Sequence, residues 1–212
     1  MSVPRVAAEP PPGWVAADIE PPKIAESAGA SITTWRASQS STSAEAFVTG
    51  CVATPIPGWV EDMRPAVEAR TVALAGASAA KITGAPVDAR SEEGVLALRA
   101  AADLGGPFVG RARTFVGFDE SRVFTCFATC ARRAPVAGPR TNTEPLGCER
   151  SVLAATLEGS RAPPQAGLAL RGATWAVHHP RPTAAIGAML VVLFGVLAVV
   201  FRRRPRSNLH RR

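Results

Sequence analysis

Histidine is absent from residues 1–177, and tyrosine is absent from the whole chain of 212 residues. The three histidines that exist, His178, His179 and His210, all follow that region. Histidine is the usual general base, a common metal ligand and the side chain that changes charge near neutral pH. Its absence therefore excludes Ser-His-Asp and Cys-His catalysis, histidine metal sites and histidine pH switches from residues 1–177.

Excess positive charge is also missing from most of the chain, although the net charge is +7. The tail, residues 202–212, holds six of the 24 basic residues, which leaves 18 basic against 17 acidic residues elsewhere. The basicity is therefore a property of the tail and not of a binding face. We expect no nucleic-acid partner.

Phosphate-binding and metal-binding motifs are missing as well. The stretch 76–83, GASAAKIT, lacks the glycine directly before Lys81 and the Ser or Thr directly after it that a phosphate loop requires. The four cysteines do not form the two close pairs that are typical of a structural zinc site. We expect neither a cofactor nor a metal ion.

One long apolar run is present, from Thr183 to Phe201, and it contains no charged residue. At a rise of about 1.5 Å per residue it extends about 28 Å, close to the thickness of the hydrocarbon core of a bilayer. The run predicts a single transmembrane helix, with the lipid bilayer as a partner. The flanking residues that we expect at the membrane–water interface are Trp175, His178, His179, Arg202, Arg203 and Arg204.

Two features conflict over the side of the membrane on which the preceding domain lies. Residues 1–22 lack the apolar run of a signal peptide, which favours a tail-anchored protein with a cytoplasmic domain. The arginine-rich tail and the four cysteines favour the opposite orientation, because positive flanks stay in the cytoplasm and disulfides form outside it. An apolar run followed by arginines also resembles the C-terminal sorting signals of some bacterial surface proteins. We expect a single-pass protein of a bacterial inner membrane, and we favour an extracytoplasmic domain over a cytoplasmic one.

Proline content and hydrophobic periodicity divide the chain into five segments. These are a Pro-rich flexible arm (1–28), a globular domain (29–160), a Pro-rich linker (161–182), the transmembrane helix (183–201) and the Arg-rich tail (202–212). Within the globular domain, β-branched or alternating stretches predict strands, and helical spacing of apolar residues predicts helices. The expected strands are 31–37, 45–54, 87–94, 95–101, 108–118 and 122–132, and the expected helices are 59–81 and 148–159.

This order predicts an α+β fold, in which an antiparallel sheet of five to six strands carries one long helix and a short C-terminal helix. The order resembles that of small domains of the PsbP/Mog1 type, and the resemblance concerns the order of elements alone. The long helix is expected to face the sheet with a stripe of six residues, namely Val60, Met63, Val67, Thr71, Leu74 and Ser78.

The four cysteines are candidates for disulfide bonds. Cys126 and Cys130 lie on one expected strand about 13 Å apart, so they cannot bond to each other. They share one face of that strand, so each can meet a partner from another element. We favour Cys130–Cys148, which closes residues 131–147, and Cys51–Cys126, which joins two elements of the sheet. The alternative is that the cysteines stay reduced and fill the core as small apolar side chains.

The missing motifs favour a non-catalytic binding or scaffold domain at a membrane, with a protein as a further partner. The alternative is a cysteine-dependent thiol-redox or hydrolytic enzyme tethered to the membrane, which requires a reactive thiol. Four arginines lie near the ends of expected strands, where they form either an anion-binding patch or a solvated face. They are Arg111, Arg113, Arg132 and Arg133.

Overall fold

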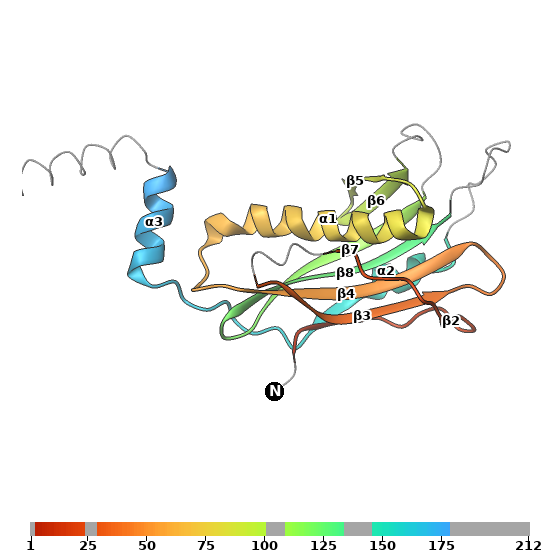
Figure 1. Ribbon diagram of the computed structural model, residues 1–212, viewed down its shortest axis with the longest axis horizontal. Helices are drawn as coiled ribbons and strands as arrows, with labels where there is room; N and C mark the ends of the chain where they lie inside the picture. Colours follow the sequence, from red (N-terminus) through yellow and green to blue (C-terminus); the bar gives the residue numbers. More distant parts are fainter. Residues whose placement is uncertain (1–2, 24–28, 101–108, 134–145, 179–212) are drawn as a thin grey trace, which may run out of the picture. The chain divides into compact units, whose positions relative to one another are not determined.

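The structure is a computed structural model that describes residues 3–23, 29–100, 109–133 and 146–178. The chain divides into two compact units, Met1–Ala166 and Gly167–Arg212. The first unit is an α+β fold, as the sequence predicted (Figure 1).

A seven-stranded antiparallel sheet forms the centre of the first unit, with the order β2-β3-β4-β8-β7-β6-β5. A two-stranded antiparallel sheet joins β1 to β9. The strands are β1 (Arg5–Ala7), β2 (Val15–Ala16), β3 (Ser31–Gln39), β4 (Glu45–Pro55), β5 (Val87–Glu92), β6 (Val95–Ala100), β7 (Gly110–Phe118), β8 (Arg122–Arg132) and β9 (Thr156–Glu158). The expected count of five to six strands was too low, because it left out β2 and the β1–β9 pair.

The two longest strands, β4 and β8, lie side by side at the centre of the sheet. They pair over their whole length, from Glu45 opposite Arg132 to Pro55 opposite Arg122. Nine successive residues of each strand are buried, because layers of side chains cover both faces of the sheet. Alternate residues of β8 serve the two faces: Phe127 packs under the long helix, whereas Ala128 and Cys130 pack on the other side.

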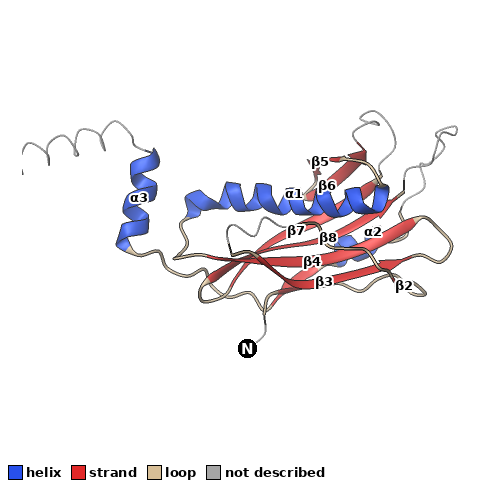
Figure 2. Ribbon diagram, viewed as in Figure 1, coloured by secondary structure: helices blue, strands red, loops and turns tan. Residues whose placement is uncertain are grey.

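The long helix α1 (Arg64–Thr83) covers one face of the sheet, after a short 3-10 turn η2 (Glu61–Met63) (Figure 2). Pro65 lies in its first turn, and Gly84 ends it in the left-handed conformation with φ of 74°. The buried residues of α1 are Thr71, Ala75, Gly76, Ser78, Ala79, Ile82 and Thr83. The expected stripe was therefore partly wrong: it included Leu74, which is only half-buried, and it missed the alanines and Gly76. Small side chains allow the helix to lie close to the sheet.

The other face is covered by the N-terminal residues and by α2 (Glu149–Ala154). Trp14 and Val6 pack there against a buried cluster that includes Phe47 and Val152. Within the expected flexible arm 1–28, residues 3–23 contribute two strands and Pro4 is fully buried. The expected helix 148–159 is shorter, since Ala155 leaves the helical conformation and β9 follows it.

The expected linker, residues 161–182, contains both packed chain and a helix. Gln165 forms an isolated bridge with Trp59, and the backbone N–H of Trp59 donates to the carbonyl of Pro164 at 2.8 Å. Helix α3 (Leu168–His178) then begins the second unit. Among the described residues no helix is long and apolar enough to cross a membrane. The predicted transmembrane helix 183–201 and the tail 202–212 lie outside the described residues, as does His179.

The turn between β7 and β8 is held by Asp119. Its Oδ1 accepts hydrogen bonds from the backbone N–H groups of Ser121, at 3.0 Å, and Arg122, at 2.8 Å, and its Oδ2 accepts one from Nε of Arg122 at 2.8 Å. Partial burial raises the pKa of Asp119, but these hydrogen bonds outweigh it and the pKa lies below its ordinary value. The carboxylate therefore stabilises the turn at neutral pH, and this contribution is lost as the pH falls through the lowered pKa.

Gly50 of β4 lies where a side chain has no room. An added Cβ would lie 2.8 Å from Cε3 of Trp35 and 3.0 Å from Cζ of Phe127, two rings that pack edge to face with centroids 5.9 Å apart. We predict that Gly50→Ala lowers the free energy of unfolding by about 1–3 kcal/mol, because an extra methyl group in a packed core forces its neighbours apart. Denaturant unfolding of the full chain, followed by near-ultraviolet circular dichroism, measures this difference in stability.

The matched control is Gly76→Ala in α1. There an added Cβ would meet only the carbonyl oxygen of Val87 at 3.8 Å, an ordinary contact. Alanine is favoured over glycine inside a helix by about 1 kcal/mol, so the control should gain stability. A loss of similar size in both variants would contradict the packing described around Gly50.

Candidate functional site

Two disulfides connect the cysteines in the pairing that the sequence favoured. Cys51 of β4 bonds to Cys126, its direct partner on β8, with Cα atoms 4.1 Å apart. Cys130 of β8 bonds to Cys148, the residue just before α2, with Cα atoms 5.6 Å apart. All four cysteines are fully buried and none is free. The cysteines are therefore neither reduced core residues nor ligands of a four-cysteine zinc site in this structure.

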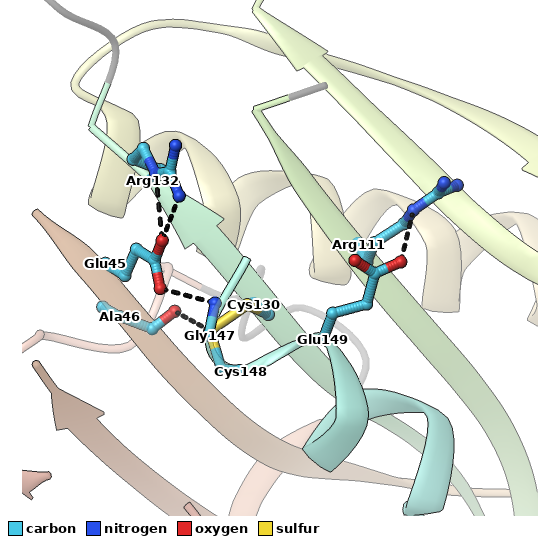
Figure 3. Close-up of a disulfide and its surroundings, with 8 residues drawn as sticks. All are labelled: Glu45, Ala46, Arg111, Cys130, Arg132, Gly147, Cys148 and Glu149. Atoms are coloured by element: carbon cyan, nitrogen blue, oxygen red, sulfur yellow. Dashed lines mark hydrogen bonds and ion pairs between the residues drawn. A yellow bond between two sulfur atoms is a disulfide. The ribbon is translucent and has the colours of Figure 1, made fainter. Parts of the chain in front are cut away.

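A buried carboxylate lies beside the Cys130–Cys148 disulfide (Figure 3). Glu45 begins β4 opposite Arg132 of β8, and its side chain is 4% exposed. Its Oε1 accepts hydrogen bonds from the guanidinium of Arg132, including one from Nε at 3.0 Å. Its Oε2 accepts a hydrogen bond from the backbone N–H of Gly147 at 2.8 Å. Burial of a carboxylate is costly unless it is paired and hydrogen-bonded, and here both oxygens are satisfied.

The disulfide explains how Gly147 reaches this carboxylate. Gly147 directly precedes Cys148, so the bond to Cys130 holds the Gly147 N–H against the end of the sheet. Sγ of Cys148 also lies 3.6 Å from the carbonyl oxygen of Ala46, a van der Waals contact because a disulfide sulfur has no hydrogen to donate. The disulfide, the ion pair and the start of β4 thus form one connected cluster, which we call the stapled end of the sheet.

The four arginines near the strand ends do not act as one patch. Nε of Arg111 lies 3.3 Å from Oε1 of Glu149, and its Nη1 donates to Glu92 at 3.0 Å. Nη1 of Arg113 donates to the carbonyl oxygens at the end of α2, those of Leu153 at 2.8 Å and Ala155 at 3.0 Å. Arg132 pairs with Glu45. Three of the four guanidinium groups therefore have internal partners, which disfavours the anion-binding interpretation.

Arg133, the fourth, lines an open cavity of about 480 Å³ that adjoins Glu45. The N-terminal chain, the β3–β4 hairpin and the end of α1 supply the other walls. The lining residues are Asp18, Ile19, Glu20, Gln39, Ser40, Ser43, Ala44, Glu45, Ala46, Lys81, Ile82 and Arg133. Carboxylates, cations, hydroxyl groups and apolar side chains all contribute, so the cavity is suited to a contact of mixed polarity.

Sequence reasoning located the disulfides but missed Glu45 and Gly147. The signal that could have found Glu45 is the register of β4 and β8, which places the two terminal charges opposite each other. Of the residues expected at a membrane interface, Trp175 lies on α3 with 44% of its surface exposed, and His178 is the last residue of α3. His179, Arg202, Arg203 and Arg204 lie outside the described residues.

Comparisons of the chain with protein-family models, with curated proteins and with solved structures found no match.

We predict that Glu45→Gln lowers the free energy of unfolding by about 3 kcal/mol, because it leaves the Arg132 guanidinium, 19% exposed, without its counter-charge. The matched control is Glu158→Gln. Glu158 also faces an arginine, Arg5, across an antiparallel pair, but both side chains are more than half exposed. Exposed ion pairs contribute about 0.2–1 kcal/mol, so the control should change little. Equal losses in the two variants would show that burial of Glu45 has no energetic role.

Replacing each disulfide by an alanine pair tests the stapled end. The residues joined are 18 apart for Cys130–Cys148 and 75 apart for Cys51–Cys126. Chain entropy predicts losses of about 3 and about 4.5 kcal/mol respectively. In the variant without Cys130–Cys148, the further loss caused by Glu45→Gln should shrink, because Gly147 is no longer held against the carboxylate. A double-mutant cycle of denaturant unfolding measures this coupling, and additive losses would contradict it.

Proposed function

We propose that this chain is a single-pass membrane protein that presents a non-catalytic binding domain on the outer side of a bacterial inner membrane. The observation that carries the proposal is the pair of fully buried disulfides. Disulfides form and persist in oxidising compartments such as the periplasm, and they are rare in the cytosol.

The orientation follows from combining the disulfides with the charges of the tail. Six arginines follow the apolar run Thr183–Phe201, and positive flanks are retained in the cytoplasm. A run that spans the membrane with its tail inside has its N-terminal side outside. That side carries the cysteines, so the two independent arguments favour the same orientation.

A binding role is favoured over the thiol-redox alternative by the burial of the sulfur atoms. Thiol–disulfide exchange requires a thiolate to reach a disulfide sulfur, and all four cysteines have no exposed surface. Hydrolytic chemistry through cysteine requires a free thiol, and each cysteine is bonded. The open cavity beside the stapled end, with its mixed charges, is the surface that we assign to a protein or peptide partner.

The redox state is tested by trapping thiols in intact cells with acid, denaturing the protein and adding a high-mass maleimide. We predict no mobility shift before reduction and the addition of four labels after it. The control is a variant with one exposed cysteine, Ala69→Cys on α1, which should accept one label before reduction. Four labels on the wild-type chain without reduction would place the domain in a reducing compartment and overturn the proposal.

The same variant tests orientation with a membrane-impermeant maleimide. Ala69→Cys should react in cells with a permeabilised outer envelope and an intact inner membrane. Ser207→Cys, in the tail, should react only after the inner membrane is opened. The reverse pattern would place the domain in the cytoplasm.

A further inference from the structure

Helix α3 has polar residues on one narrow stripe only. Arg171 and Thr174 are three residues apart and lie on one side of the helix, and His178 follows four residues later in the sequence. The remaining positions of Leu168–His178 are Leu, Ala, Gly, Trp and Val. Such a pattern gives an amphipathic helix with a broad apolar surface.

Two large apolar side chains of α3 are exposed. Leu168 is 87% exposed and Trp175 is 44% exposed, and these two residues, seven apart, lie on one flank of the polar stripe. Ala169 and Ala173, on the side away from the stripe, are also exposed. Large exposed apolar side chains on a helix indicate an interaction surface.

The hydroxyl group of the polar stripe has its hydrogen-bond partners within the helix. Oγ1 of Thr174 donates within the helix, to the carbonyl oxygens of Leu170 and Arg171 at 3.0 Å each. Arg171 is exposed. An arginine can keep its guanidinium in water while its aliphatic stem lies along an apolar surface. The stripe is therefore compatible with a helix half immersed in a lipid surface.

The covalent chain places α3 beside the bilayer. Four residues, 179–182, separate the end of α3 from the apolar run that begins at Thr183. Four residues reach at most about 14 Å even when fully extended. The interfacial layer on each side of the hydrocarbon core is about 5–8 Å thick. If the run spans the membrane, the end of α3 therefore lies in the interfacial layer or directly next to it.

We propose that α3 is an interfacial helix, which lies in the headgroup layer on the same side as the domain. Its alanine side faces the acyl chains, Leu168 and Trp175 lie at the boundary, and Arg171 remains in water beside lipid phosphates. Trp is enriched at this depth because its ring is apolar and its N–H is polar. The proposal rests on the transmembrane run of the proposed function, and it adds a second lipid contact outside that run.

The experiment uses the full chain in vesicles of phosphatidylethanolamine and phosphatidylglycerol, with a spin label on one introduced cysteine. The native cysteines are bonded, so the introduced thiol is the one that reacts. Ala169→Cys and Ala173→Cys report the side away from the stripe, and Thr174→Cys and His178→Cys report the stripe. Collisions of the spin label with oxygen indicate that the labelled position lies in lipid. Collisions with a water-soluble nickel chelate indicate that it lies in water. We expect oxygen collisions to dominate at positions 169 and 173, and nickel collisions to dominate at 174 and 178.

Two further labels separate the failure of this proposal from the failure of the proposed function. Leu193→Cys, inside the apolar run, should show oxygen collisions with almost no nickel collisions, and Ala69→Cys on α1 should show the opposite. If position 193 is in lipid but 169 and 173 are as accessible to nickel as 174 and 178, α3 is solvated and the proposal is wrong. If positions 169 and 173 are shielded from both oxygen and nickel, they contact protein, and the proposal of an interfacial helix is also wrong. Nickel accessibility at position 193 would overturn the proposed function.

Discussion

The pairing of β4 with β8 is the constraint on which the rest of the domain depends. Both strands are buried on both faces, and the Cys51–Cys126 bond joins directly opposite residues. Because side chains alternate along a strand, a slip of one residue would move every side chain of β8 to the other face. Such a slip would separate the two cysteines and bring Phe127 out of the layer under α1. The disulfide and the hydrophobic pattern therefore specify the same register.

The stapled end of the sheet follows from that register. Cys130 lies four residues after Cys126 and so emerges on the same face of β8, where it meets Cys148. The register also places Arg132 opposite Glu45. Once Cys148 is held, the N–H of Gly147 supplies the hydrogen bond that the second carboxylate oxygen needs. The strand pairing therefore places the two charges of the buried ion pair, and the disulfide places the third hydrogen-bonding group, the N–H of Gly147.

Elements with a long, regular pattern could be predicted from the sequence, and those without one could not. The strands 45–54 and 122–132 and the long helix carry enough apolar residues at regular spacing to be recognised. The strands β1 and β2 have two or three residues each and lie among prolines, so no periodicity marks them. Their pairing depends on partners remote in sequence, β9 and β3. Helix α3 was missed because prolines flank it on both sides and suggest extended chain.

Only the part of the site that depends on spacing within one strand, the disulfide pairing, could be predicted from the sequence. The spacing of Cys126 and Cys130 excludes a bond between them, which restricts the pairing. The Glu45–Arg132 pair was not found, because assigning it requires knowing which strands are neighbours and in what register. Two expected strands with a charge at one end can pair in several ways, and only the packed sheet selects one.

Little free chain separates the first unit from α3 in the sequence. The backbone N–H of Trp59 donates to the carbonyl of Pro164, and an added Cβ on Gly58 would lie 2.7 Å from Cα of Ala166. The chain is thus fixed to the first unit as far as Ala166, and a single residue, Gly167, separates it from the start of α3. The described part of the expected linker 161–182 thus consists of chain that packs on the first unit, one glycine and α3.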